Sequence, residues 1–134
     1  MIRIHQGIDI VDIRKFREIS SRNKSFIPDI FTERERDYCL SCKDPSIHFA
    51  GRFAAKEACM KALGWGVSVA GSDHLLYEIE IGRHPAGRPV LSLSGWALKI
   101  SKKKRIYQFT VSISHTVHTA VALVILAGTG QGKI

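Results

Sequence analysis

Two acidic residues and a lysine have the types and spacing of a site that handles phosphate. Glu57 and Lys61 stand four residues apart in an Ala-rich segment, so on a helix they project side by side from the border of an apolar stripe. Asp9 stands between Ile8 and Ile10 in a segment suited to burial, where a carboxylate needs a partner or a metal. Two carboxylates from separate elements suit Mg²⁺, which keeps water and substrate phosphates as its other ligands. Lys61 would then meet a phosphate oxygen as a point charge.

Taken singly, each of these residues also fits a plain structural role. Glu57 and Lys61 match an ordinary i, i+4 ion pair, which contributes only about a few tenths of a kcal/mol. Asp9 fits a turn or a helix cap. The combination of all three is what indicates phosphoryl chemistry.

Two further groups of reactive side chains stand elsewhere in the sequence. The strand end at residues 112–116 (SISHT) fits phosphate or hydroxyl binding better than a Ser/His hydrolase, because no nucleophile elbow accompanies it. A plain polar strand end fits it equally well. Cys39 and Cys42 form a lone CxxC, and Cys59 stands apart, so a four-ligand zinc site is not indicated. We interpret the three cysteines as structural or incidental.

The first third of the chain is predicted to form a strand followed by short helices. Ile2, Ile4, Ile8 and Ile10 share one parity, which predicts a strand with one buried face that ends near Asp12. Asp12 can cap a basic helix whose apolar side holds Ile13, Phe16 and Ile19. Thr32 and Glu35 form a capping-box pattern that opens a helix through about Leu40.

The rest of the chain predicts one long helix and two pairs of strands. Asp44 and Pro45 open an Ala-rich helix, which is broken by Gly64, Gly66 and Gly71. Strands are expected at residues 76–81 and 89–93, joined by a turn at 84–87, and at 109–113 and 120–126, joined by a turn near Val117. Ser94 can cap a helix that ends in the basic run 102–105. This order predicts one α+β domain over residues 1–127, with a mostly antiparallel sheet packed on the long helix and a flexible tail at 128–134.

Composition limits the class of protein and points to an anionic partner. The 134 residues carry 20 Lys and Arg against 12 Asp and Glu, a net charge of +8, with 45% hydrophobic content typical of a globular domain. The N-terminus shows no signal peptide, and the apolar run at 120–127 is too short to span a bilayer. Together with an odd number of cysteines, these features predict a cytoplasmic protein without membrane partners.

Four segments in order resemble holo-acyl-carrier-protein synthase, the short single-domain class of phosphopantetheinyl transferases. They are residues 7–11 (GIDIV), 51–58 (GRFAAKEA) with 61–64 (KALG), 87–89 (GRP) and 111–116 (VSISHT). The resemblance runs from about residue 4 to residue 126. It implies the 4'-phosphopantetheinyl transferase fold and transfer of the phosphopantetheine of coenzyme A to a serine of an acyl carrier protein in fatty acid synthesis, releasing adenosine 3',5'-bisphosphate.

The resemblance also implies roles for individual residues. Asp9 and Glu57 match the Mg²⁺ ligands and, with Lys61, the catalytic set. The coenzyme A site would be lined by Arg52, Lys61, Gly64, Pro89, His115 and Thr116. A basic helix with Arg14, Arg17 and Arg22 matches the surface that docks the acidic carrier protein. Members of the family are typically homotrimers with active sites between subunits, so neighbouring chains would share each site.

Two other classes of protein remained as alternatives. A basic nucleic-acid-binding module would use the charges at 14–24 and 99–105, but no aromatic side chains alternate with them as stacking platforms. We therefore expect no nucleic acid partner. A subunit that binds carrier protein without catalysis would not need the intact set of Asp9, Glu57 and Lys61.

Overall fold

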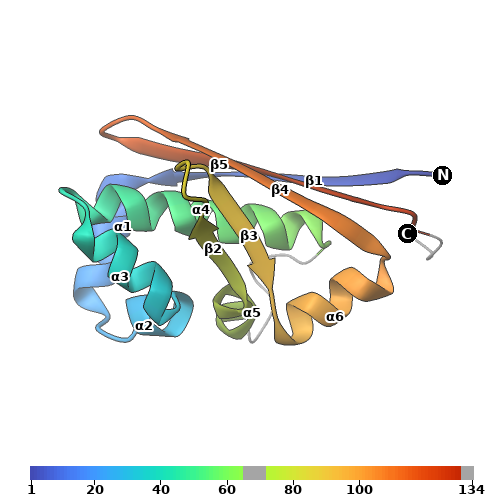
Figure 1. Ribbon diagram of the computed structural model, residues 1–134. Helices are drawn as coiled ribbons and strands as arrows, with labels where there is room; N and C mark the ends of the chain where they lie inside the picture. Colours follow the sequence, from blue (N-terminus) through green and yellow to red (C-terminus); the bar gives the residue numbers. More distant parts are fainter. Residues whose placement is uncertain (65–71, 131–134) are drawn as a thin grey trace.

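The computed structural model of the chain describes residues 1–64 and 72–130. A three-stranded antiparallel sheet in the order β1-β5-β4 covers one side of a long central helix, and a two-stranded sheet and the shorter helices lie on the other side of that helix (Figure 1). The elements are β1 (Arg3–Asp12), α1 (Ile13–Arg22), α2 (Phe26–Ile30), α3 (Glu33–Ser41), α4 (Pro45–Ala62), α5 (Ser72–Glu78), β2 (Ile79–Arg83), β3 (Pro89–Leu93), α6 (Gly95–Lys103), β4 (Ile106–His115) and β5 (Thr119–Gly128). The predicted α+β class with antiparallel strands on a long helix is confirmed.

The central helix α4 packs directly on the backbone of β1. Gly7 makes this approach possible, because a Cβ at this position would overlap Ala58 O and lie 2.8 Å from Ala62 N. The facing side of α4 is rich in alanine, and Ala54, Ala55 and Ala58 are completely buried. Small side chains on both elements therefore set the distance between β1 and α4, and that distance controls which of their side chains meet.

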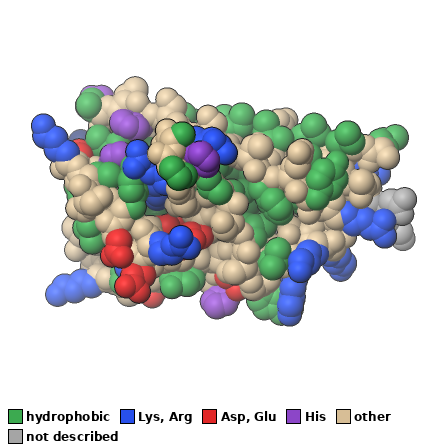
Figure 2. Space-filling view, viewed as in Figure 1, with side chains coloured by type: hydrophobic (Ala, Val, Ile, Leu, Met, Phe, Trp, Pro, Cys, Tyr) green, Lys and Arg blue, Asp and Glu red, His purple; other side chains and the backbone are tan. Residues whose placement is uncertain are grey.

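The prediction that the isoleucines of β1 form its buried face is wrong. Ile2, Ile4, Ile8 and Ile10 are 65%, 64%, 60% and 69% exposed, whereas Gly7 and Val11, of the opposite parity, face α4 and are buried. The register places Ile8 beside Leu123 and Ile10 beside Val121 of β5, so the outer face of the sheet is apolar. Figure 2 shows hydrophobic side chains along the upper edge, where this sheet lies in Figure 1. Alternation separates the two faces of a strand, but it does not say which face the core covers.

Helices α1 and α3 begin as predicted, each at a side-chain cap. Asp12 Oδ1 accepts a hydrogen bond from Lys15 N at 3.0 Å at the start of α1, although Ile19 of this helix is 50% exposed. Thr32 and Glu35 form the predicted capping box at the start of α3. The short helix α2 was not predicted. Pro45 opens α4, but Asp44 makes no cap hydrogen bond and instead accepts one from Arg17 Nη2 at 3.1 Å.

The second half differs from the prediction at one junction. Residues 76–78, predicted as strand, belong to α5, and β2 begins only at Ile79. Glu78, the last residue of α5, accepts a hydrogen bond at its Oε1 from Ala97 N at 3.1 Å and so links this junction to the start of α6. Ser94, predicted to cap α6, makes no side-chain cap bond there. Gly66 and Gly71 of the predicted helix break lie outside the described residues.

The β2–β3 and β4–β5 pairs are confirmed, with β4 longer than predicted at both ends. Gly128, which we assigned to the tail, is the last residue of β5, and residues 131–134 lie outside the described part of the chain. Over the described residues, no helix has the length and apolar character needed to cross a bilayer.

Candidate active site

Asp9, Glu57 and Lys61 meet between β1 and α4. Lys61 Nζ lies 2.9 Å from Asp9 Oδ1 and also donates a hydrogen bond to Ile8 O at 3.0 Å. The Asp9 side chain is 11% exposed and that of Lys61 is 43% exposed, so the pair stands at the border between core and solvent. The structure thus brings together the three residues that the sequence singled out from distant positions.

Glu57 shares the buried side of this cluster with Asp9. Burial, followed by a hydrogen bond and charge repulsion from Asp9, raises the pKa of Glu57 to about 8, although the nearby Lys61 opposes the shift. Asp9 Oδ2 is buried and has no hydrogen-bond partner among the described residues. Two adjacent carboxyl groups, one protonated near neutral pH and one with an unpartnered oxygen, are suited to sharing a divalent cation.

The cluster supplies two protein carboxylates and no more. Within the part of the chain that the structure describes, no three His, Cys, Asp or Glu side chains are grouped so as to hold a metal ion. A hard cation bound here would therefore keep several positions for water or substrate oxygens, which is usual for Mg²⁺ in phosphoryl-transfer sites.

Arg52 lies on a different side of α4 from Glu57 and Lys61. Five residues separate Arg52 from Glu57, which corresponds to a rotation of about 140° around a helix with 3.6 residues per turn. Arg52 is 7% exposed, its guanidinium lies 4.3 Å from the centre of the Tyr38 ring, and its Nε is buried without a hydrogen-bond partner among the described residues. Within one chain, Arg52 and the carboxylate cluster are therefore two separate sites.

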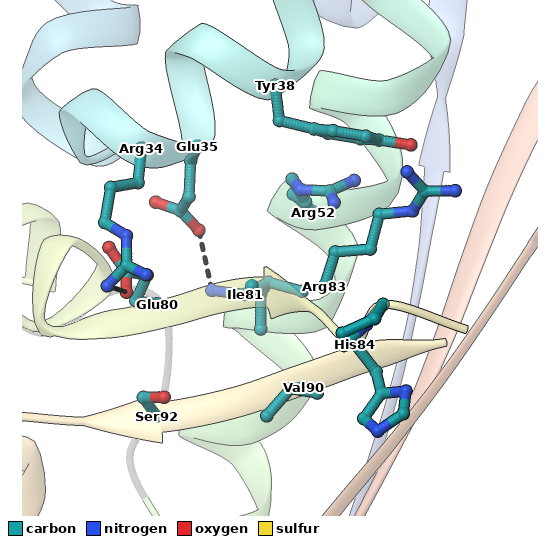
Figure 3. A pocket seen from close by; sticks show the side chains of 12 residues that line it. Arg34, Glu35, Tyr38, Arg52, Glu80, Ile81, Arg83, His84, Val90 and Ser92 are labelled. Carbon is teal, nitrogen blue, oxygen red and sulfur yellow. Dashed lines mark hydrogen bonds and ion pairs between the residues drawn. The ribbon is translucent and has the colours of Figure 1, made fainter. Parts of the chain in front are cut away.

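A cavity of about 400 Å³ opens beside Arg52, between α3, α4 and the β2–β3 hairpin (Figure 3). Arg83 of β2 approaches the Tyr38 ring to 5.2 Å, so two guanidinium groups lie near one aromatic ring. The ring of His48 lies 5.8 Å from Tyr38 and 6.2 Å from His115 at the end of β4. Burial, followed by the charge of Arg52, lowers the pKa of His48. This concentration of cationic and neutral donor groups is suited to an anionic ligand.

The remaining predicted coenzyme A residues are spread over three places. Gly64 follows the end of α4 with a φ of +90°, and Pro89 begins β3 on the edge of a second cavity of about 220 Å³. Thr116 Oγ1 accepts hydrogen bonds from the backbone N–H groups of His118 and Thr119, both at 3.1 Å, and so shapes the β4–β5 turn. The structure brings His115 close to the Arg52 cavity and leaves Gly64 at the far end of α4.

The predicted docking helix α1 carries its arginines on the surface. Arg14 and Arg22 both form ion pairs with Glu18, at 3.5 and 3.6 Å, and their side chains are 88% and 76% exposed. Arg17 instead pairs with Asp44 beside the start of α4. Exposed pairs of this kind contribute little to stability, which leaves the arginines available to another acidic partner.

Sequence reasoning missed Tyr38, His48 and Arg83 as neighbours of Arg52. Tyr38 stands one turn after Glu35 of the capping box, which the sequence did identify, and Arg83 ends β2, two residues beyond the strand predicted at 76–81. Nothing in the spacing of these residues shows that α3, α4 and β2 converge. The three cysteines are free, and burial raises the pKa of both Cys39 and Cys59 to about 12, in keeping with a structural role.

Comparison with known proteins identifies the family. The model of the 4'-phosphopantetheinyl transferase superfamily matches residues 6–122 of this chain. The chain belongs to this superfamily. Among curated members of the superfamily, the chain is 44% identical over 123 residues to holo-[acyl-carrier-protein] synthase of Syntrophus aciditrophicus, covering 91% of this chain and 94% of the relative.

Solved structures of transferases from this superfamily have the same fold. The apo-ACPS structure from Chronobacterium ammoniagenes superposes with a TM-score of 0.83 at 31% identity, covering 96% of this chain and 99% of that one. The complex of that protein with coenzyme A superposes with a TM-score of 0.82, also at 31% identity, covering 95% of this chain and 98% of that one. The resemblance to the holo-acyl-carrier-protein synthase family is therefore confirmed over nearly the whole chain.

Proposed function

We propose that this chain transfers the 4'-phosphopantetheine group of coenzyme A to a serine hydroxyl of an apo acyl carrier protein. The products are holo acyl carrier protein and adenosine 3',5'-bisphosphate, and the reaction serves fatty acid synthesis. The main support for this function is that Asp9, Glu57 and Lys61 lie together in one cluster. The chain that holds them is 44% identical to a holo-[acyl-carrier-protein] synthase. We further propose a cytoplasmic location, which suits three free cysteines.

Asp9 and Glu57 are the residues that would hold a magnesium ion. The fit rests on the buried Oδ2 of Asp9, which lacks a partner among the described residues, and on the raised pKa of Glu57 beside it. When bound, Mg²⁺ neutralises charge on the pyrophosphate. Both side chains would offer it carboxylate oxygens, the ligands that this ion prefers.

Lys61 would act on the same pyrophosphate as a point charge. Its partly exposed ammonium can turn from Asp9 towards a phosphate oxygen, where the positive charge stabilises the transition state. The serine oxygen forms a bond to the phosphorus that carries the pantetheine arm, and the bond from that phosphorus to the bridging oxygen breaks. The serine proton leaves to water or to a carboxylate, and the bridging oxygen departs with adenosine 3',5'-bisphosphate.

The cavity beside Arg52 would take the nucleotide end of coenzyme A. Arg52 and Arg83 supply positive charge, and Tyr38 holds both guanidinium groups near the opening. His115 and Thr116 lie at the adjoining strand end, and Pro89 and Gly64 complete the set that the family resemblance assigns to coenzyme A. The chemistry of the cavity supports this role, since three arginines against two glutamates line it, while phosphate esters are anionic.

A homotrimer would join these two sites into one. Arg52 and Glu57 point to different sides of α4, so coenzyme A spanning both sites needs a second copy of the chain to bring a carboxylate cluster beside an Arg52 cavity. The exposed isoleucines of β1 and Leu123 of β5 form an apolar surface of the kind that subunit interfaces cover. Assembly through this surface would place neighbouring active sites between chains.

Helix α1 would dock the acidic carrier protein and so align its serine. The exposed Arg14 and Arg22, with Arg17 beside the start of α4, present positive charge that steers an acidic partner. Holding the serine near the in-line position contributes to the rate by orientation rather than by chemistry.

Intact-mass spectrometry of the carrier protein tests the function directly. Incubation of the chain with coenzyme A, Mg²⁺ and an apo carrier protein should add one phosphopantetheine group to the carrier. Omission of coenzyme A is the blank, and Leu40→Asp, a change on the exposed side of α3, is the control variant. An unmodified carrier protein in the presence of folded enzyme would refute the proposed function.

A further inference from the structure

Lys56 and Glu35 form a fully buried ion pair, and Glu35 is one of the residues that line the cavity of Figure 3. Lys56 Nζ lies 2.8 Å from Glu35 Oε1, and the two side chains are 0% and 1% exposed. A buried pair of this kind is a poor source of stability, because the cost of removing two charges from water offsets their attraction. Its presence therefore calls for a reason other than stability.

The hydrogen bonds of the pair converge on the start of β2. Lys56 Nζ donates to Leu76 O at 2.9 Å and to Ile79 O at 2.6 Å, so with Glu35 all three of its hydrogens are used. Glu35 Oε2 accepts from Ile81 N at 2.8 Å, as Figure 3 shows. The pair thus ties the backbone of the α5–β2 junction to α3 on one side and to α4 on the other.

These bonds hold β2, one wall of the cavity, against α3 and α4, which also line it. Residues 80–83 of β2 form one wall, α3 with Tyr38 forms the opposite wall, and Arg52 of α4 lies between them. Arg83 is two residues beyond Ile81, on the same strand that Glu35 holds. A shift of β2 relative to α3 would therefore separate Arg83 from the Tyr38 ring, which it now approaches to 5.2 Å.

We infer that Glu35 and Lys56 are positioning residues that keep Tyr38, Arg52 and Arg83 at the spacing needed to bind the nucleotide end of coenzyme A. Glu35 is one of the residues that line the cavity, but both side chains are buried and their polar atoms bond within the protein. The identity of the ligand rests on the proposed function. The role of the pair in holding β2 rests on its hydrogen bonds to Leu76, Ile79 and Ile81. Lys56 also directly precedes Glu57 on α4, so the same helical turn serves the cavity and the carboxylate cluster.

The test replaces both charges with neutral groups of similar shape. In the double variant Glu35→Gln/Lys56→Met, no unpaired charge is left in the core, and the directed bonds of Lys56 to β2 are lost. The matched control is Leu126→Ala, which loosens the buried side of β5 away from the cavity. Both are studied at a temperature at which thermal melting shows them to be folded. If the double variant does not fold, Glu35→Gln/Lys56→Leu, which also leaves no charge in the core, replaces it.

Two measurements separate positioning from general damage. We expect the Kd for adenosine 3',5'-bisphosphate, from titration calorimetry, and the KM for coenzyme A to rise about tenfold in the double variant, with kcat changed less than about threefold and the KM for carrier protein unchanged. The control should keep the Kd of the unaltered protein. An unchanged Kd in the double variant, or an equal rise in Kd in the control, overturns the inference. No binding by the unaltered protein refutes the proposed function, and this inference with it.

Discussion

Lys61 reaches across from α4 to β1, and its ammonium lies 2.9 Å from Asp9 Oδ1. The contact makes Lys61 the natural counter-ion of Asp9 whenever no other cation is bound. Under the proposed function, Asp9 and Glu57 would hold a divalent ion, and Lys61 would then be free to meet a phosphate. Asp9, Glu57 and Lys61 should therefore act together in transfer.

Substituting either carboxylate should abolish transfer without unfolding the protein. Asp9→Asn and Glu57→Gln keep the side-chain shape but remove the negative charge that a divalent cation needs, so kcat/KM should fall about 100-fold or more. Asp12→Asn, which changes a capping carboxylate on the same strand, is the matched control. Full activity in both site variants, measured by carrier-protein mass, would exclude the proposed metal site.

Divalent-cation binding should strengthen as the pH rises towards 8. Since the pKa of Glu57 is raised to about 8, its carboxyl is mostly protonated at pH 6 and must release a proton when a cation binds. Calorimetry with Mg²⁺ should show an affinity that falls about tenfold per pH unit below 8, with about one proton released. Glu57→Gln should remove the proton release, and pH-independent affinity between 6 and 8 would contradict the assignment.

The same shift gives the metal-free protein a pH dependence of stability with a definite sign. Folding raises the Glu57 pKa above its usual value near 4.5, so the folded state binds more protons than the unfolded state between these two values. The contribution of Glu57 to the free energy of unfolding should therefore decrease as the pH rises from about 4.5 to about 8. Thermal melting in the presence of a chelator should show this decrease, and Glu57→Gln should flatten it.

Arg52 should require its planar guanidinium, and not only its charge. Arg52→Lys keeps the charge but loses stacking on Tyr38, so the KM for coenzyme A should rise about tenfold while the KM for carrier protein stays the same. Arg36→Lys, on α3 but outside the cavity lining, is the control. Steady-state kinetics that show equal effects on both substrates would argue against a nucleotide role for the cavity.

The apolar outer face of the sheet should determine the oligomeric state. Ile4→Asp places a charge on this face, whereas Leu40→Asp places one on α3, and the two side chains are 64% and 66% exposed. Light scattering should show a trimer for the unaltered chain and for Leu40→Asp, and smaller, inactive species for Ile4→Asp. A fully active monomer would show that one chain completes the site alone.

Local patterns predicted most helices and strands, and they failed where a distant residue decides the outcome. Thr32 and Glu35 mark the start of α3 because both ends of the capping box lie within four residues. Residues 76–78 read as strand, yet they form a helix whose Glu78 reaches Ala97, 19 residues further along. A window of neighbouring residues contains no sign of such a bond.

The site was predicted only in part, because some of its contacts also join residues that are distant in the sequence. Asp9, Glu57 and Lys61 could be named from residue types and from a family resemblance, and the structure brings them together. Lys56 was passed over because its neighbours in sequence are alanine and Glu57, whereas its partners, Glu35 and the start of β2, lie 20 or more residues away. The isoleucines of β1 were wrongly assigned to the buried face of the sheet. An apolar outer face produces the same alternation of residues along a strand as a buried face does.

Gly7 is the point of closest packing between β1 and α4. Since Ala58 O and Ala62 N fill the space that a side chain would occupy there, the helix cannot slide along the strand without striking the Cβ atoms on either side. The close contact at Gly7 fixes the position of α4 along β1. It therefore fixes where Glu57 and Lys61 lie relative to Asp9, two residues further along β1. The residue that aligns the reacting groups in this enzyme is thus one without a side chain.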